Sequence, residues 1–416
     1  MLHAIKPDGP FGESMAKAVQ TCVHCGFCLS ACPTYQEFGE EMDSPRGRIV
    51  LMKQVLEGGL AAEAAQPHID RCLGCLACEP ACPSGVVYRD LISPFRATME
   101  SEGKFRRGPA ARFRRWVAGA TIPHPARFRG ALVLARMARP FRALVPPSLR
   151  PMLELAPSNV PKAIVLPEFS PARGARRARV ALLAGCAQQV LDPDINLATI
   201  EVLTRNGVEV VVPPGQGCCG GLAWHTGDLA AARGFARRNL DAFPADVDAV
   251  VTNAAGCGSM LHEYHLVLAG TPDSDRAETF RHRVVDVSVF LARLGLRERP
   301  PGTGRQRLAY HDACHLANAQ GVRVEPRDLL RAVPGLELVE VPDPHLCCGS
   351  AGTYNLDQPE TAASLGEKKA RAIIGTGATA VATGNIGCLT QIGVHLRNLG
   401  SPIRIRHTMQ VLRDAY

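Results

Sequence analysis

The chain has 416 residues, sixteen of them cysteine, and a formal charge of +8 at neutral pH. This length allows two or three domains with sizeable hydrophobic cores. Residues 1–20 carry charged side chains and no apolar signal segment, and no run of about eighteen apolar residues follows. These features argue against a secreted, disulfide-linked protein and against a transmembrane helix. We therefore expect a cytoplasmic protein whose cysteines bind metal.

Two runs with identical cysteine spacing lie within the first hundred residues. Each reads C-x2-C-x2-C-x3-C-P, and their cysteines are Cys22, Cys25, Cys28, Cys32, Cys72, Cys75, Cys78 and Cys82. In bacterial ferredoxins, three thiolates of such a run bind one [4Fe-4S] cube and the fourth binds the other cube. Zinc is the alternative, but a zinc ion needs only four ligands and leaves the further cysteines unexplained. The runs therefore predict an iron–sulfur unit.

The segment between the two runs is predicted to be helical. Ser44 is a good N-cap residue, and Pro45 suits the first helical position after it. Apolar residues then recur at helical spacing until Gly58, which is expected to end the helix. A second helix is expected from about Pro67 into Cys72. Each cysteine run would thus lie between helices.

Residues 101–177 form a basic bridge. Between residues 103 and 150 there are one lysine, eleven arginines and no acidic residue, so this segment carries +12 while the remainder is net acidic. Residues 127–139 can form an amphipathic helix, and the proline-rich stretch after residue 146 is typical of an extended connector. The bridge is either a solvated linker packed on the iron–sulfur unit or a docking face for an acidic partner or an anionic membrane. Nucleic acid is not expected, because no binding motif accompanies the charge.

Residues 178–300 and 301–416 contain two copies of one pattern. In each copy a strand-like segment leads to a single cysteine, a Cys-Cys-Gly follows 32 or 33 residues later, and another strand leads to a last cysteine. The eight cysteines are Cys186, Cys218, Cys219, Cys257, Cys314, Cys347, Cys348 and Cys388. Helical stretches at 196–206, 228–243 and 359–374 alternate with the strands, which predicts a parallel α/β sheet in each copy. Buried cysteine can be a plain hydrophobic residue, but matched offsets at the ends of strands favour one four-thiol site per copy.

Taken together, these segments predict an α+β multidomain protein. Its parts are an α-helical 2[4Fe-4S] ferredoxin domain (1–100), an arginine-rich helical bridge with a proline-rich linker (101–177), and two α/β cysteine-rich repeats (178–300 and 301–416). No G-x-G-x-x-G follows a strand, so no flavin or nicotinamide site is expected. Hydride chemistry would then take place on another chain, and this one would handle single electrons.

The cysteine runs, residues 43–49 and the paired Cys-Cys-Gly repeats resemble the iron–sulfur subunit family of glycolate oxidase (glycolate dehydrogenase). The resemblance is closest at residues 345–354 and 385–388, and it covers nearly the whole chain, with the bridge matching least specifically. Families of similar architecture are the C subunit of anaerobic glycerol-3-phosphate dehydrogenase, lactate-utilisation iron–sulfur proteins and heterodisulfide reductase.

This resemblance implies an oxidoreductase subunit that has no catalytic residues of its own. A separate FAD-containing subunit would oxidise glycolate to glyoxylate, and this chain would pass the electrons to a membrane quinone or another acceptor. Such a complex would sit at the inner face of the plasma membrane through peripheral contact. The resemblance also implies two ligand sets, which are Cys22, Cys25, Cys28 and Cys82 for one cube, and Cys72, Cys75, Cys78 and Cys32 for the other.

Both repeats depart from the heterodisulfide reductase pattern. In that family each repeat ends in C-x2-C and holds a non-cubane cluster with five thiolates, whereas Met260 and Gln391 take the last position here. This argues against a self-contained disulfide reductase. Four thiolates per repeat could still hold an ordinary cube or a zinc ion, or form a partner-docking scaffold without metal.

Three histidines lie next to the cysteines of the second repeat. His311 and His315 flank Cys314, and His345 precedes Cys347. A histidine could replace a thiolate, as in Rieske centres, or relay protons to a quinone. The plainer interpretation is that these histidines are packing or surface residues.

Overall fold

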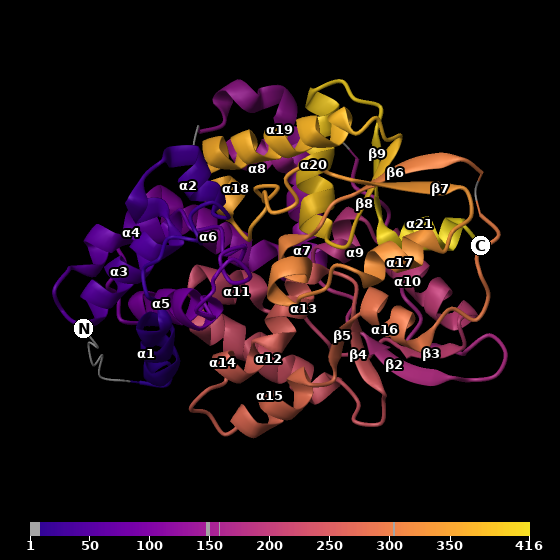
Figure 1. Ribbon diagram of the computed structural model, residues 1–416, viewed down its shortest axis with the longest axis horizontal. Helices are drawn as coiled ribbons and strands as arrows, with labels where there is room; N and C mark the ends of the chain where they lie inside the picture. The colour runs from indigo at the N-terminus through magenta and orange to yellow at the C-terminus, as the bar shows by residue number, and fades with distance from the viewer. Residues whose placement is uncertain (1–8, 147–149, 158, 303) are drawn as a thin grey trace.

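The computed structural model describes residues 9–146, 150–157, 159–302 and 304–416. A helical unit that contains both cysteine runs lies on one side of the molecule, and two α/β units lie on the other (Figure 1). Each α/β unit has a sheet with helices packed around it. The expected α+β class is therefore confirmed.

Short helices separate the cysteine runs of the iron–sulfur unit. They are α1 (Gly12–Thr21), α2 (Pro33–Phe38), the 3₁₀ turn η1 (Glu41–Asp43), α3 (Pro45–Leu56), α4 (Ala62–Asp70) and α5 (Arg89–Ser101). Helix α3 begins as predicted, because the Ser44 side chain accepts a hydrogen bond from the Gly47 amide. Helix α4 differs from the prediction, since it begins at Ala62 and contains Pro67. Strong helix formers precede Pro67, so the helix extends past the proline at the loss of one backbone hydrogen bond.

The bridge is mostly helical. Its elements are α6 (Pro109–Thr121), α7 (Pro125–Ala138), the 3₁₀ segment η2 (Arg139–Leu144) and α8 (Arg150–Leu155). The amphipathic helix predicted over residues 127–139 lies largely within α7. The proline-rich stretch is extended only in part: residues 159–167 have no regular secondary structure, but α8 forms within the stretch.

Several bridge arginines make ion pairs inside the molecule. Arg107 pairs with Asp70 and Glu100 of the iron–sulfur unit, and Arg114 pairs with Asp357 of the second repeat. The three acidic side chains thus neutralise part of the +12 charge of the bridge. These contacts support the packing interpretation for this end of the bridge, around α6.

The two α/β units have sheets with equivalent strand orders. The first sheet has the order β1-β3-β2-β4-β5 and the second has β7-β6-β8-β9. Their strands are β1 (Phe169–Ser170), β2 (Ala178–Leu182), β3 (Val208–Val211), β4 (Ala249–Thr252), β5 (Val284–Asp286), β6 (Gln306–Tyr310), β7 (Leu336–Glu340), β8 (Ala380–Thr383) and β9 (Arg404–His407). All neighbours are parallel except β1, which pairs antiparallel with β3. The predicted parallel sheets and the internal repeat are confirmed.

Helices connect the strands and cover the sheets. In the first unit they are α9 (Gln188–Leu191), α10 (Asp194–Arg205), α11 (Gly221–Thr226), α12 (Leu229–Ala242), α13 (Ala255–His262), α14 (Tyr264–Val267), α15 (Ser274–Arg281) and α16 (Val287–Leu294). In the second they are the π-helical turn η4 (His315–Ala319), α17 (Glu325–Arg331), α18 (Tyr354–Asp357), α19 (Pro359–Gly375), α20 (Ile386–Asn398) and α21 (Thr408–Asp414). The three helices predicted in the repeats are α10, α12 and α19.

The units share hydrophobic cores. Phe11 of the iron–sulfur unit packs against Trp224 of the first repeat, with ring centroids 5.8 Å apart, in a cluster that also contains Phe95. Helix α21, at the end of the second copy, packs on α10 of the first, where Arg413 pairs with Asp194. Among the helices that the structure describes, none is both long and apolar enough to cross a bilayer.

Candidate metal centres

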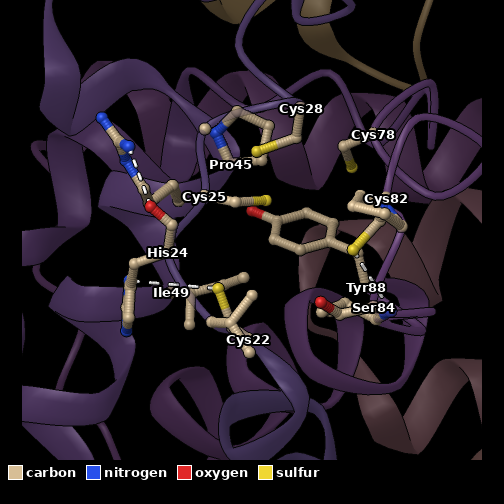
Figure 2. Close-up of a pocket in the computed structure, with 15 residues that line it drawn as sticks. Cys22, His24, Cys25, Cys28, Pro45, Ile49, Cys78, Cys82, Ser84 and Tyr88 are labelled. Carbon is tan, nitrogen blue, oxygen red and sulfur yellow. Dashed lines mark hydrogen bonds between the residues drawn. The ribbon is translucent and has the colours of Figure 1, made fainter.

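Cysteines from both runs line a first cavity in the iron–sulfur unit. Cys22, Cys25 and Cys28 come from the first run, and Cys82 comes from the end of the second run. Figure 2 shows these four side chains around the ring of Tyr88, with Cys78 at the far edge of the cavity. The structure thus brings together the four cysteines of the first implied ligand set.

A second cavity contains the other four cysteines. It is lined by Cys72, Cys75 and Cys78 of the second run and by Cys32 from the end of the first. Cys78 and Tyr88 line both cavities, so the two cavities are adjacent. When Cys78 is counted with the second cavity, each cavity takes three cysteines from one run and one from the other. Two neighbouring four-thiol sites of this kind suit electron hopping between bound clusters.

The backbone follows the same path in the two runs. After the first cysteine, His24 and Gly26 adopt positive φ angles of 57° and 87°, and the equivalent residues Gly74 and Leu76 have 63° and 57°. Such angles are costly for non-glycine residues by about 1–3 kcal/mol and concentrate at functional sites. They curl each run around its cavity. In the second run the curl also lets the Gly74 amide donate a hydrogen bond to the Cys72 sulfur, 3.4 Å away.

The chemistry of the thiols fits a bound metal cluster. Burial raises the pKa of the Cys28 thiol to about 11 and those of Cys75 and Cys78 well above their ordinary value. Several buried thiolates can persist side by side only when cations bind them. At Cys72, burial opposes ionisation, but the positive charges of Arg48 and Arg96 lower the pKa of this thiol below its ordinary value.

The two cavities differ in exposure. Cys25, on the first cavity, is exposed, and the neighbouring Val23 and Phe27 are each 67% exposed. In the second cavity Cys32 and Cys75 are buried. The buried Arg48 guanidinium lies 3.9 Å from the Cys32 sulfur. The first cavity therefore lies at the surface, and the second lies inside the molecule.

The cysteines of the first repeat form a contiguous row. The sulfur atoms of Cys186 and Cys218 are 3.4 Å apart, and the Gly220 amide donates to the Cys218 sulfur over 3.4 Å. A hydrogen bond with Cys218 lowers the pKa of Cys219, but a hydrogen bond with Cys257 and burial raise it well above its ordinary value. The four thiols expected to converge in this repeat therefore lie together.

In the second repeat, Cys314, Cys347, Cys348 and Cys388 form a matching row. Ligand atoms of His311, Cys348 and Cys388 lie within 4.8 Å of one another, and all three residues are buried. Asn385 donates a hydrogen bond to the Cys388 sulfur over 3.5 Å. Three buried N and S donors at this spacing form a group of the type that binds zinc or iron.

The remaining candidates from the sequence have other surroundings. The Gln391 amide donates to the Ala362 carbonyl over 3.1 Å, and Met260 is buried beside Gly220, so neither replaces a fifth thiolate. The Nε2 atom of His315 lies 3.0 Å from the Gly74 carbonyl oxygen. His345 is exposed in the loop before Cys347.

Sequence analysis missed several residues that line the cavities. Arg48 and Tyr88 border the second cluster cavity, and Arg96 and His225 border a larger cavity next to it. Arg48 lies on the buried face of helix α3. Arginine is rarely buried without a partner, so its position in the apolar pattern could have marked Arg48 as a candidate site residue. Nothing in the sequence around His225 distinguishes it, because its role depends on tertiary neighbours.

Comparisons with known proteins agree with this arrangement. Residues 18–86 match the 4Fe-4S dicluster domain, and residues 180–262 and 308–393 match the Cysteine-rich domain. The chain is 39% identical to the glycolate oxidase iron-sulfur subunit of Escherichia coli, over 95% of this chain and 94% of that relative. It is 37% identical to the probable glycolate oxidase iron-sulfur subunit of Bacillus subtilis, over 95% of this chain and 93% of the relative.

The chain belongs to the family of glycolate oxidase iron–sulfur subunits. It is therefore an iron–sulfur electron-transfer subunit of an oxidoreductase, and the family resemblance seen in the sequence is confirmed. A more distant relative is the lactate utilization protein A of Oceanobacillus iheyensis, which is 31% identical over 56% of this chain and 96% of its own length.

Proposed function

We propose that this chain carries electrons from the flavin of a partner subunit through two [4Fe-4S] clusters to a quinone or another acceptor, while the partner oxidises glycolate to glyoxylate. The observation that carries the proposal is the exchange of cysteines between two adjacent cavities. The proposed ligand sets are Cys22, Cys25, Cys28 and Cys82 for one cluster, and Cys72, Cys75, Cys78 and Cys32 for the other. Bound there, the clusters supply one-electron transfer.

The exposed face around Cys25 is the proposed contact for the FAD-containing partner. Val23 and Phe27 give this face apolar side chains next to the first cavity. Exposed apolar groups at such a place favour docking of another protein, and docking would shorten the path from flavin to cluster. Electrons would then enter at the exposed cavity and leave from the buried one.

The names of the two similar relatives support glycolate as the substrate of the partner. Lactate and glycerol 3-phosphate are the alternatives, and the choice depends on the flavoprotein rather than on this chain. The proposed location is the cytoplasmic side of the plasma membrane. Its support is the bridge, where Trp116, Leu134 and Met137 are exposed and Arg136 adds an exposed positive charge.

The second Cys-Cys-Gly repeat is proposed to bind a metal ion or a further cluster. Its four cysteines form a row, and His311 lies close enough to Cys348 and Cys388 to act as a ligand. The first repeat has the same cysteine row (Cys186, Cys218, Cys219 and Cys257), which makes it a candidate for the same role.

Replacement of Cys25 by serine tests the function. In a complex reconstituted with the flavoprotein, Cys25→Ser should abolish electron delivery to quinone, while glycolate still reduces the FAD of the partner. Iron and sulfide analysis with EPR of the anaerobic wild-type protein should give about eight iron atoms for two cubes, and more iron or zinc if a repeat is loaded. Full quinone reduction by the variant complex would show that the proposed path is wrong.

A further inference from the structure

A large cavity lies where the iron–sulfur unit meets both repeats. Its volume is about 1600 Å³, part of which is open to solvent. Cys72, which also borders the second cluster cavity, lines one wall, while Cys257 and Cys314 come from the first and second repeats. A molecule in this central cavity would therefore lie next to the buried cluster site, and Cys25 does not line this cavity.

Two histidines lie edge to face in the central cavity. The ring centroids of His225 and His315 are 5.5 Å apart. One nitrogen of each ring is held by the protein: the Nδ1 atom of His225 lies 3.4 Å from the Ser93 hydroxyl, and Nε2 of His315 lies 3.0 Å from the Gly74 carbonyl oxygen. The other nitrogens, Nε2 of His225 and Nδ1 of His315, are buried and have no hydrogen-bond partner within the described chain.

These two nitrogens suit a ligand that carries oxygen atoms. A buried polar atom without a partner costs about 1–3 kcal/mol, so the arrangement favours a molecule that supplies the missing hydrogen bonds. Because a carbonyl can only accept, His315 donates from Nε2 to Gly74 and its Nδ1 is left as an acceptor. His225 can donate from Nε2 when the Ser93 hydroxyl donates to its Nδ1. One carbonyl oxygen and one hydroxyl group would satisfy this pair.

A channel with both apolar and charged side chains in its walls continues from the central cavity. It has a volume of about 1540 Å³, again partly open to solvent, and shares Leu222 with the central cavity. Helix α6 forms one wall with Trp116 and Gly119, and Phe235 lies among the residues of the opposite repeat. Trp116 is 66% exposed, so the channel reaches the apolar face of the bridge.

The junction between the cavity and the channel carries little net charge. Arg107 and Arg115 line both spaces, but they pair with Asp70 and Glu100. Paired arginines do not favour a free anion, whereas a neutral ligand with an apolar tail can pass beside them. At this junction the charge pattern therefore favours a neutral occupant. The cavity itself adds Arg114, which pairs with Asp357, and Arg96, which donates to the Ile69, Cys72 and His225 carbonyl oxygens.

We propose that a quinone-type acceptor binds here, with its head group in the central cavity beside His225 and His315 and its isoprenoid tail in the channel along α6. The proposal rests on the electron path described above and names the place where the path ends. The acceptor takes two electrons, delivered one at a time from the cluster site that includes Cys72, and two protons from solvent at the open mouth of the cavity. The product is the hydroquinone, whose hydroxyl group can donate to Nδ1 of His315.

Two glycines provide a matched test of the channel. A Cβ added at Gly119 of α6, or at Gly130 of α7, meets nothing within 4 Å, and both residues are helical. Only Gly119 lines the channel. Gly119→Trp should therefore fill the channel without disturbing the helix, and Gly130→Trp is the control.

The assay uses full-length, cluster-loaded protein reduced with dithionite, so that it does not depend on the flavoprotein. With a benzoquinone that carries a ten-carbon tail, Gly119→Trp should lower the rate of cluster reoxidation and the equilibrium binding of the quinone by about tenfold or more. Gly130→Trp should match wild type, and ferricyanide should oxidise all three proteins equally. Unchanged binding and rate in Gly119→Trp would overturn the proposed channel.

The head-group site is tested separately with His225→Leu and His225→Gln. Leucine should slow reoxidation by tailed and tailless benzoquinones alike, and glutamine, which restores an N–H donor, should recover much of the rate. Equal rates for wild type and His225→Leu would overturn the head-group site, as would oxidation of the reduced protein by a disulfide in place of quinone. Failure of glycolate to reduce the clusters in the full complex would instead refute the proposed function and leave this result standing.

Discussion

The two cysteine runs have the same spacing and the same backbone path, yet their surroundings are opposite. The first cavity lies at the surface, with Cys25 exposed and a half-buried arginine, Arg46, beside it. The second cavity is buried, and its arginine is Arg48, which is 1% exposed. The same motif thus lies at the protein surface in one case and in a buried environment in the other.

This difference supports the proposed direction of electron transfer, from the first cavity to the second. A cluster site that partner proteins can approach suits electron entry, and a buried cluster site beside a solvent-connected cavity suits delivery to a small molecule. Net charge, hydrogen bonds and solvent exposure tune the reduction potential of iron–sulfur clusters. Positive charge held near buried thiolates, as at Arg48 and Arg96, stabilises added electrons at the second site.

The largest expected effect of the asymmetry is on stability. Arg48 pairs with the fully buried Asp43 and donates hydrogen bonds to the His68 carbonyl oxygen and the Thr34 hydroxyl. Arg48→Met leaves these buried groups without their partner, and the free energy of unfolding should fall by about 3–5 kcal/mol. Urea unfolding of the anaerobic, loaded protein measures this loss.

Arg46→Met is the matched control for that experiment. Arg46 pairs with Glu41 at the surface, where the two side chains are 29% and 46% exposed. Exposed pairs contribute about 0–1 kcal/mol, so this variant should unfold close to wild type. Similar losses for Arg46→Met and Arg48→Met would contradict the contrast between the two environments.

The next effect concerns docking at the exposed site. Val23→Asp places a charge on the apolar face beside the first cavity and should raise the flavoprotein concentration needed for half-maximal cluster reduction by about tenfold. Val324→Asp is the control, because Val324 is similarly exposed, at 61% against 67% for Val23, and lies in the second repeat. If both variants are reduced like wild type at every flavoprotein concentration, the partner docks elsewhere.

The sequence predicted the parts of the molecule that depend on local pattern. The start of α3 at Pro45 follows from a cap and a proline, and the parallel sheets follow from the alternation of strands and helices. Cysteine spacing named the cysteines that the structure groups around the first two cavities, with Cys78 bordering both, and the two ligand sets implied by the family resemblance stay a prediction. That grouping needs only the geometry of two similar runs facing each other.

What the sequence did not predict depends on packing between units. His225 and His315 are 90 residues apart and meet only because the two repeats and the iron–sulfur unit come together. The start of α4 was placed too late because an interior proline was expected to begin the helix rather than to lie within it. The ion pairs of Arg107 and Arg114 could not be predicted from the sequence, because their acidic partners belong to other units and approach only in the folded chain.

The smallest expected effect is on the pH dependence of stability. Beside the first cavity, a hydrogen bond from Arg46 holds the pKa of the exposed Glu41 below its ordinary value. Glu263 is buried in the core that joins the iron–sulfur unit to the first repeat, and burial raises its pKa to about 7, against a hydrogen bond of 2.7 Å from the Trp224 indole. The two carboxyl groups should therefore respond to pH in opposite ways.

For Glu263 the sign follows from proton binding. Between the unfolded pKa, which is about 4.3, and the folded pKa near 7, the folded protein binds more protons than the unfolded chain, so stability falls as pH rises. Glu263→Gln keeps an acceptor for the Trp224 indole without a charge. In the wild-type protein the free energy of unfolding should fall by about 1 kcal/mol between pH 6 and pH 8, and this fall should be absent in the variant. Urea unfolding at each pH measures both. Glu41→Gln is the control and should keep the fall in stability, because Glu41 is ionised throughout this pH range. If the stability of Glu263→Gln instead falls with pH as in wild type, Glu263 is already ionised at pH 6.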